Sequence, residues 1–428
     1  MFWRDHGLPL VTLKRVLLIA IILEVSLGGG GRLFETGSVS PRMVLFVLAL
    51  AFTAAVLLLY RERVPRVFVI LSVMFVALSG TSSFMGVLTG QSTAAMLVDF
   101  RPMAYFMILP FFALTIRTMN DVVLVSRLLK FSALTLAILY LGTMAYWTSG
   151  AISTIQMFEW LNPEHTAEAE FLFRGETTFF FKALLYVGVG VFFFIIEKKW
   201  YWIPVALTLL LAIAITMTRG MWLAVFIVMA MWAFLFIGGR MKGTFLAIWL
   251  ISVGILGALL INHTLPSVEQ SNAIRLNDLR SIAALVAPAE NVVAPAENVV
   301  RPSPMMVVFG HGFGAQVFGR TMIEITYVNI FVEQGLIGII FWLLPLAYMA
   351  WQVIRIRDSV LRAQALPYLM GTFFVYVVSL TNPFLTNPIG MAVVLIAMVV
   401  IRVIRQSSGE DRAVLVPGSA PDQLERRQ

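Results

Sequence analysis

The chain alternates between long apolar stretches and shorter polar segments that carry most of its charged residues. Each apolar stretch is close to the roughly 20 residues that a helix needs to cross the hydrocarbon core of a membrane. The pattern therefore predicts an all-α polytopic membrane protein with about twelve transmembrane helices. The predicted spans are residues 15–33, 43–60, 66–85, 103–117, 131–148, 178–196, 200–217, 220–237, 244–261, 328–354, 364–380 and 388–404.

Lysine and arginine gather in alternate loops, which sets the expected orientation because positive residues of short loops stay on the cytoplasmic side. With the N-terminus inside, the basic clusters fall in the cytoplasm. They are Arg4, Lys14 and Arg15; Arg61, Arg63 and Arg66; Arg117, Arg127 and Lys130; Lys198 and Lys199; Arg240 and Lys242; Arg355, Arg357 and Arg362; Arg402 and Arg405. Arg32, Arg42 and Arg101 fall outside as isolated residues. An even number of spans then places both termini in the cytoplasm.

Composition supports a membrane protein and argues against several other classes. With 60% hydrophobic and 13% charged residues, the chain has too much apolar surface for a soluble core, so apolar side chains face lipid and one another. The net charge of +8 is explained by the cytoplasmic clusters, with anionic lipid head groups as their partner, and nothing further supports nucleic-acid binding. The sequence contains no cysteine, which removes disulfides and thiolate ligands, and no spacing typical of metal ligands is visible.

The predicted spans divide the chain into four parts. These are the first nine helices at 1–261, a periplasmic loop at 262–327, the last three helices at 328–405 and a disordered cytoplasmic tail at 406–428. Within the loop, NAIRLNDLRSIAAL spaces its apolar residues as an amphipathic helix on a membrane surface does. The tandem copies of APAENVV at 287–300 are typical of a slipped duplication in a tolerant loop, and we assign them no role.

Several arginines are predicted on the periplasmic side, where the orientation rule disfavours them. Arg219 lies in the turn TMTRGMW between two spans, and Arg174 precedes the sixth span, with Lys182 about two turns further along the same predicted helix. The outer loop adds Arg275, Arg280 and Arg320. An arginine at the membrane edge either snorkels to head groups or meets an anion, and both alternatives stay open for each residue alone. Together, their planar guanidinium groups suit pyrophosphate oxygens.

Three further features are predicted at the same side. The segment GHGFG at 310–314 resembles a phosphate-binding loop, but it follows no clear strand and lacks a Walker lysine, so we expect a turn, in which His311 is either solvated or a proton-transfer group. Glu324 leads into the tenth span, where it either marks the helix start or exchanges protons. Glu333, about two and a half helical turns deeper, is expected to be a buried partner of an arginine or a polar packing group.

The order of these motifs resembles that of the O-antigen ligase and polymerase superfamily. The chain has an arginine before a mid-chain span, Arg174, and a T-R-G turn between two spans at 218–220. A long outer loop then ends in G-x-G-x-G, and the next span opens with E-x-x-Y-x-x-x-x-x-E-x-G-L-I-G. The resemblance covers residues 170–345, and the earlier spans match in number alone.

This resemblance implies a glycosyltransferase that acts at the periplasmic face of the bacterial inner membrane on glycans carried by undecaprenyl pyrophosphate. In that family the equivalents of Arg174 and Arg219 engage the lipid pyrophosphate, and an outer-loop arginine, here Arg275 or Arg280, is often involved as well. These groups would stabilise charge on the leaving pyrophosphate without a metal ion or another cofactor. The further candidate substrate-binding residues are Arg320, Lys182, Tyr327 and His311.

One departure bears on the choice between polymerase and ligase. Ligases of this family typically open the corresponding span with a His-Asn pair, the histidine three positions before the aromatic residue, whereas this chain has Glu324 and Ile325 ahead of Tyr327. We therefore expect a polymerase that joins lipid-linked repeat units, with Glu324 orienting or deprotonating the acceptor hydroxyl. A chain-length regulator is a further candidate partner, and no local motif identifies the sugars.

Two other functions stay open. A ligase that transfers glycan to lipid A core would share the fold and the arginines. A transporter of lipid-linked glycans would also have about twelve spans and a cavity that attracts anions. Against transport, the two halves of the sequence show no visible repeat, and the charged residues gather at one face instead of the middle of the bilayer.

Overall fold

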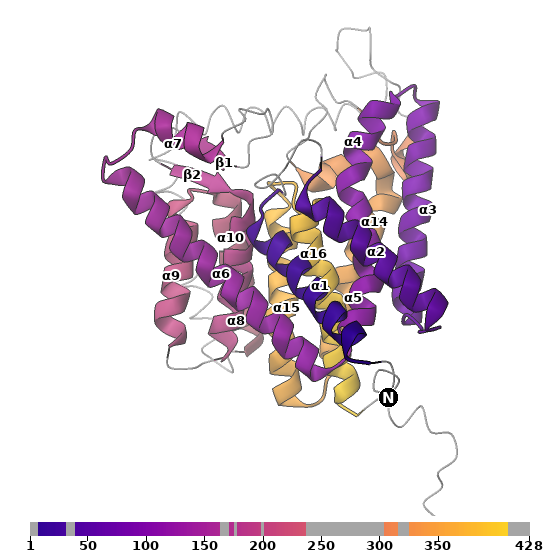
Figure 1. The fold of residues 1–428 in the computed structure, drawn as a ribbon. Coiled ribbons are helices and arrows are strands. Elements are labelled where there is room, and N and C mark those ends of the chain that lie inside the picture. The colour runs from indigo at the N-terminus through magenta and orange to yellow at the C-terminus, as the bar shows by residue number, and fades with distance from the viewer. Residues whose placement is uncertain are drawn as a thin grey trace, which may run out of the picture.

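The computed structural model describes residues 7–30, 39–162, 171–174, 178–197, 201–236, 304–315 and 325–409. These residues form a bundle of helices with a short strand pair at one end (Figure 1). The first part contains α1 (Gly7–Leu27), α2 (Pro41–Leu59), α3 (Arg66–Leu88), α4 (Thr93–Met103), α5 (Leu109–Thr115), α6 (Met119–Thr148), α7 (Thr154–Leu161), β1 (Phe171–Arg174) and β2 (Thr178–Phe181). The second part contains α8 (Leu185–Glu197), α9 (Trp202–Ile215), α10 (Arg219–Phe236), α13 (Pro304–Phe309), α14 (Thr326–Ile354), α15 (Ser359–Val378) and α16 (Pro388–Ser407). Short 3-10 helices, Ala104–Ile108 and Lys182–Leu184, lead into α5 and α8.

Many of these helices have the length and composition of membrane spans. Among the described residues, the 7 segments long and apolar enough to cross a membrane are 41–59, 66–88, 93–115, 119–148, 326–354, 359–378 and 388–407. Shorter apolar helices cover 182–196, 202–215 and 219–232. The prediction of a mostly helical protein with several helices long and apolar enough to span a membrane is therefore confirmed. The predicted span at 244–261 and most of the predicted loop at 262–327 lie outside the described residues, so the loop and the total of about twelve spans stay predictions.

Two helices are longer than the apolar pattern predicts. The segment expected at 103–117 begins at Thr93, continues past Pro102 and passes through a 3-10 stretch before α5. The segment expected at 131–148 begins at Met119, because Thr118 and Asp121 form a capping box that starts α6 ahead of its apolar part. Hydropathy locates the membrane-spanning part of a helix, whereas caps decide where the helix itself begins.

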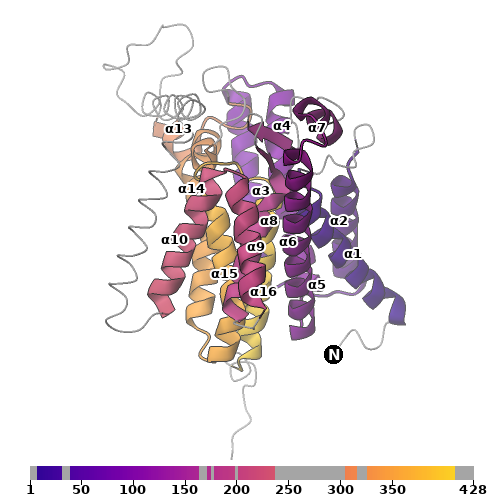
Figure 2. The same cartoon turned by 90° about the vertical axis from the view of Figure 1, so that its left-hand side faces the viewer.

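The two ends of the bundle carry different connections. One of them, which we call the hairpin end, contains β1, β2 and α7 together with the connections 216–218, between α9 and α10, and 379–387, between α15 and α16. The hairpin and α7 lie at the top of Figure 1, and Figure 2 shows α8, α9, α10 and α15 running down from this level side by side. The helix α1 begins at the opposite end (Figure 1). The candidate residues Arg174, Lys182, Arg219 and Tyr327, which the structure describes, lie on segments at or near the hairpin end.

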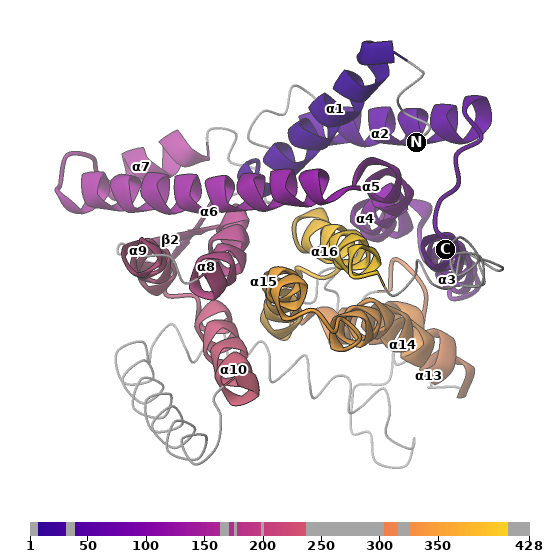
Figure 3. The ribbon, with the colours of Figure 1, turned by 90° about the horizontal axis from the view of Figure 1, so that it is seen from below.

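The core of the bundle is built around α16. Every residue from Ile389 to Ile401 is buried, and α5, α6, α14 and α15 pack around this helix (Figure 3). Glycines allow neighbouring helices to approach closely, as is usual in membranes, where small residues permit tight van der Waals packing. A Cβ on Gly188 of α8 would overlap the ring of Phe374 on α15. Many leucine, isoleucine and valine side chains on the outside of the bundle are exposed, as lipid-facing residues are.

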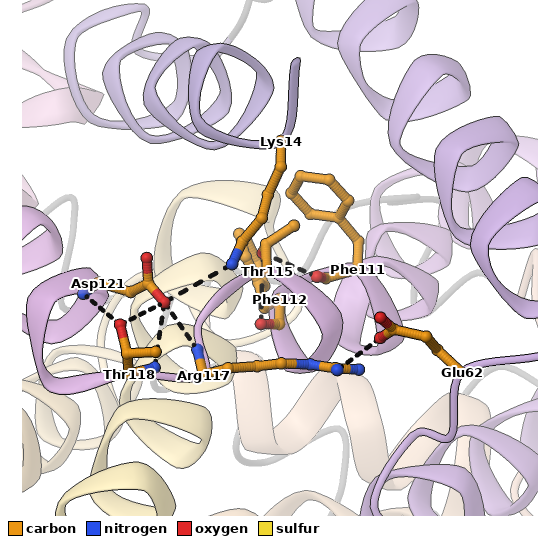
Figure 4. Close-up of polar contacts among 8 residues, drawn as sticks. All are labelled: Lys14, Glu62, Phe111, Phe112, Thr115, Arg117, Thr118 and Asp121. Atoms are coloured by element: carbon orange, nitrogen blue, oxygen red, sulfur yellow. Dashed lines mark hydrogen bonds and ion pairs between the residues drawn. The ribbon is translucent and has the colours of Figure 1, made fainter. Parts of the chain in front are cut away.

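A cluster of polar residues joins α1 to the connections between α2 and α3 and between α5 and α6, at the end opposite the hairpin (Figure 4). Asp121 accepts hydrogen bonds from the backbone N–H groups of Arg117 and Thr118, at 3.1 and 3.0 Å, and its Oδ2 lies 3.6 Å from Lys14 Nζ on α1. The Arg117 guanidinium pairs with Glu62, on the connection between α2 and α3, at 2.5 Å. The buried carboxylate of Asp121 thus caps α6 and neutralises a buried lysine at the same time.

The segment before α8 is a strand pair, so the prediction that Arg174 and Lys182 share one helix is wrong. In the antiparallel pair, Arg174 lies opposite Thr178 and Phe171 lies opposite Phe181. Aromatic and β-branched residues suit a pleated, half-buried surface, and here the rings of Phe171 and Phe181 stack with centroids 4.7 Å apart. Lys182 follows β2 directly and begins a 3-10 helix.

Candidate functional site

Arg219 is the first residue of α10 and follows a very tight turn. The helix α9 ends at Ile215, and Met217 adopts a positive φ of 50°, a conformation that costs a non-glycine residue energy. The indole N–H of Trp222 donates to the carbonyl of Ile213 at 3.1 Å and holds the turn closed. Arg219 is half-buried at the N-terminus of α10, where the helix dipole favours an anion.

The strand pair lies directly against this turn. The hydroxyl of Thr178 on β2 donates to the carbonyl of Ile215, the last residue of α9, at 2.7 Å. Because Arg174 is paired with Thr178, the backbone of Arg174 lies on the strand next to the one that contacts the Arg219 turn. Lys182, at the far end of β2, is half-buried. The hairpin thus brings the segments that carry Arg174, Lys182 and Arg219 together, although none of them shares a helix with another.

The start of α14 reaches the same place through the connection 379–387. The N–H of Thr326 donates to the carbonyl of Ser379 at 3.2 Å, and its hydroxyl donates to the carbonyl of Asn382 at 2.9 Å. On the other side of this connection, a Cβ added to Gly220 would overlap Thr381 Oγ1 and lie 3.0 Å from Asn382 Nδ2. The first turns of α10 and α14 therefore meet on one connection.

Tyr327, predicted to contact substrate, is half-buried in the first turn of α14. Its hydroxyl donates to the carbonyl of Tyr376 on α15 at 2.9 Å. This bond uses the phenolic hydrogen and fixes the ring, while the phenolic oxygen keeps its capacity to accept a hydrogen bond.

The loop 310–314 is a turn, as expected, and its backbone N–H groups are used within the protein. His311 and Gly312 donate to the carbonyls of Val332 and Glu333 on α14, at 2.6 and 3.1 Å. Phe313 donates to the carbonyl of Ser82 on α3 at 3.1 Å. A phosphate-binding loop needs N–H groups that point at its ligand, whereas these three point at backbone carbonyls.

This loop fits a break in α14. Gly335 has φ 64° and ψ −160°, which interrupts the helix and leaves carbonyls of the preceding turn without their usual intrahelical donors. The loop supplies those donors, so the irregular backbone is paired with and buried in protein. Gly310, Gly312 and Gly314 all have positive φ, between 79° and 86°, and the close approach of backbone leaves no room for side chains at the first two of them.

His311 is attached to α3 and α14 through its backbone. Its carbonyl accepts the hydroxyl of Thr89 at 2.9 Å, in addition to the bond from its N–H to Val332. Burial lowers the pKa of the imidazole below its usual value, so the neutral form prevails at pH 7. Its contacts are with α3 and α14, whereas the turn that precedes Arg219 contacts β2, and Gly220 packs against the connection 379–387.

Glu333 is buried, and within the part of the chain that the structure describes its side chain is hydrogen-bonded to an asparagine. Asn329, one turn earlier on α14, donates its amide N–H to Glu333 Oε1 at 2.7 Å. The carboxylate is 1% exposed, immediately before the break at Gly335.

Four predicted site residues lie outside the part of the chain that the structure describes. They are Glu324, Arg275, Arg280 and Arg320. The described chain resumes at Ile325, and α14 begins at Thr326. No group of three or more His, Cys, Asp or Glu residues that could hold a metal ion occurs among the described residues.

Sequence reasoning missed the residues on the connection 379–387. Thr381 and Asn382 contact the first turn of α10, and the Asn382 carbonyl receives Thr326 from α14. The available signal was the tandem T-N-P in LTNPFLTNP, which places two asparagines in one short connection between two spans. Only the folded chain reveals that this connection lies beside Arg219.

The apolar helices are those of a mostly helical protein with several helices long and apolar enough to cross a membrane, and polar contacts gather at one end of the bundle. The chain is 25% identical over 389 residues to the O-antigen polymerase of Shigella flexneri, covering 89% of this chain and 93% of that relative. No protein-family model matches the chain. The resemblance drawn from motifs at 170–345 is thus supported over most of the chain, and its polymerase-like form fits.

Proposed function

We propose that the protein polymerises glycan repeat units carried by undecaprenyl pyrophosphate at the periplasmic face of the bacterial inner membrane, with both termini in the cytoplasm. The observation that carries this proposal is the convergence at the hairpin end. The segments of Arg174, Arg219 and Tyr327 meet there through Thr178 and the connection 379–387. The O-antigen polymerase of Shigella flexneri, similar over most of the chain, supports a polymerase-type function.

In the proposed reaction, the hydroxyl oxygen of an acceptor unit attacks the anomeric carbon of the donor glycan. The bond from that carbon to the pyrophosphate oxygen breaks, and its electron pair leaves with undecaprenyl pyrophosphate. Glu324 accepts the proton of the acceptor hydroxyl and releases it to water afterwards. Metal-independent catalysis requires positive groups at the leaving oxygen, a role we assign to Arg174 and Arg219, with Arg275, Arg280 or Arg320 contributing from the outer loop.

The position of Arg219 suits this role. The N-terminus of α10 and the positive charge of Arg219 both favour an anion at this position. Arg219 is half-buried, so water screens its charge less than at an open surface. Lys182, at the end of β2, adds a further positive charge to this end of the bundle. Tyr327 and His311 are the remaining candidate substrate contacts, and a chain-length regulator is the proposed protein partner.

The test is the profile of surface and lipid-linked glycans from a deletion strain complemented with wild type, Arg219→Ala or Glu324→Gln. Arg63→Ala is the matched control, because Arg63 is exposed on the connection between α2 and α3, at the opposite end. We expect single repeat units from the deletion and both site variants, and full-length chains from wild type and Arg63→Ala.

Two other outcomes contradict the proposal in different ways. Long chains stranded on the carrier lipid would identify a ligase that transfers finished glycan to lipid A core. If the deletion leaves the glycan profile unchanged, the protein does not assemble glycans, and transport becomes the leading hypothesis. Immunoblots of membrane fractions confirm that each variant is present.

A further inference from the structure

The connection 379–387 is the meeting point of three segments that carry candidate residues. Thr326, next to Tyr327, donates to the Asn382 carbonyl, and Gly220, next to Arg219, packs against Thr381 and Asn382. The ring of Phe384 contacts Phe180 of β2 edge to face, with centroids 6.4 Å apart. A substrate that reaches both Arg219 and the start of α14 therefore lies beside this connection.

Asn382 is held in a fixed orientation by its neighbour. The hydroxyl of Thr381 donates to the carbonyl of Val378 at 3.1 Å and accepts a hydrogen bond from Asn382 Nδ2 at 2.9 Å. This bond uses one N–H of the amide. Within the described residues, the side-chain carbonyl oxygen of Asn382 accepts no hydrogen bond, and Asn382 is half-buried next to the exposed Pro383.

The second asparagine of the tandem T-N-P has a structural role instead. Asn387 caps α16, its Oδ1 accepting the N–H of Ile389 at 3.1 Å. Two asparagines in the same sequence context thus differ in what they do. The amide oxygen of Asn387 serves the fold, whereas that of Asn382 remains available beside the N-terminus of α10.

We propose that Asn382, oriented by Thr381, is a glycan-binding residue that contacts hydroxyl groups of the sugar next to the reacting bond. A primary amide offers a donor and an acceptor on adjacent atoms, which matches neighbouring sugar hydroxyls, and it is neutral, so it does not repel a pyrophosphate held by Arg219. The connection 379–387 also contacts the first turn of α14, which follows the proposed proton acceptor Glu324. The Asn382 amide would therefore lie between the pyrophosphate of the donor and the hydroxyl group of the acceptor. This inference rests on the proposed function and adds a sugar contact to it.

The experiment uses the purified full-length protein in lipid nanodiscs with the lipid-linked repeat unit as substrate, and it measures initial rates. For Asn382→Ala we expect the KM for the repeat unit to rise about tenfold while kcat stays within about twofold, as when a contact present in both ground and transition states is removed. Thr381→Val, which removes the oxygen that orients the amide, raises KM by a smaller factor. Asn387→Ala lowers the thermal unfolding midpoint and leaves KM unchanged.

The outcomes separate this inference from the proposed function. The proposed sugar contact is wrong if wild type is active and Asn382→Ala either has the wild-type KM or lowers kcat alone. The proposed polymerisation would not be affected by that result. If wild-type protein forms no glycosidic bonds from the lipid-linked unit, both proposals fall. Should Asn382→Ala not accumulate in the membrane, Asn382→Gln decides, because it keeps an amide but displaces it by one methylene. We expect its KM to rise severalfold, and a wild-type KM would overturn the contact.

Discussion

The hydroxyl of Thr326 donates to the backbone carbonyl of Asn382 at 2.9 Å and so joins the first turn of α14 to the connection between α15 and α16. Thr326 is fully buried, and its N–H makes a second bond to the carbonyl of Ser379 at 3.2 Å. One side chain thus positions the residues that follow Glu324 relative to those beside Arg219. Loss of this contact should affect stability and reaction together.

Thr326→Val replaces the hydroxyl with a methyl group of nearly the same shape and leaves the Asn382 carbonyl without that donor. We expect a loss of about 1–2 kcal/mol of unfolding free energy, the usual cost of leaving one buried polar group unpaired. Glycan chains made by the variant should be shorter, because the acceptor side is less well positioned. Thermal unfolding in nanodiscs and gel analysis of the glycans test this, with Thr326→Ser as the control that should behave as wild type.

Gly220 provides a steric test of the contact between α10 and the same connection. A methyl group at this position would overlap Thr381 Oγ1, so Gly220→Ala should push the connection away from the Arg219 turn. We expect a loss of about 1–3 kcal/mol in stability, as overpacking usually costs, and a large fall in polymerisation rate. The control is Gly142→Ala on α6, where an added Cβ meets nothing within 4 Å. Equal effects of the two substitutions would contradict the close packing inferred here.

The break in α14 can be tested by comparing two glycines that both have positive φ. Gly335 has φ 64° and Gly90 has φ 76°, so alanine is strained at both. At Gly335 the new methyl would also collide with the carbonyl of Val308, whereas at Gly90 it meets nothing within 4 Å. We therefore expect Gly335→Ala to lower the unfolding free energy by about 1–3 kcal/mol more than Gly90→Ala. Thermal unfolding of the two variants gives the difference directly.

The cluster of polar residues at the opposite end should affect stability without affecting the reaction. Asp121→Ala removes the carboxylate that pairs with the buried Lys14 and one half of the capping box of α6, so we expect a loss of about 3–5 kcal/mol in unfolding free energy. Replacing the lysine as well, in Asp121→Ala with Lys14→Met, should restore part of that loss, because the buried positive charge is removed together with the carboxylate that balanced it. Protein that remains folded should keep the wild-type KM. A raised KM in the folded fraction would mean that this end also influences substrate binding.

Features of the fold that depend on interactions between residues close in the sequence could be predicted, whereas contacts between distant segments could not. Spans such as 66–85 and 388–404 were predicted closely, since a membrane helix must satisfy its own backbone and hydropathy reports this directly. The turn at 310–314 followed from its glycines. Arg174 was assigned to the wrong element, because strand pairing between Phe171 and Phe181 outweighed the apolar pattern that suggested a helix.

The site itself depends on contacts between distant parts of the chain. Thr178 contacts Ile215, and Asn382 lies beside Gly220. Both contacts result from the packing of whole helices, and no local sequence motif predicts them. The arginines could be proposed from the predicted orientation, which assigns them to the side where arginine is disfavoured, while the connection 379–387 could not. The roles of Glu324, Arg275, Arg280 and Arg320 stay predictions.

The last prediction concerns how Arg219 acts. If its guanidinium stabilises charge on the leaving pyrophosphate, Arg219→Ala should lower kcat by about 10²–10³-fold, the usual effect of removing one preorganised donor from such a site. Arg219→Lys should lie between wild type and alanine, because it keeps the charge but loses the planar fork that binds two oxygens at once. Initial rates with the lipid-linked repeat unit separate kcat from KM. If Arg219 merely anchors the turn at the membrane edge, lysine should restore full activity, since a lysine reaches the head groups equally well.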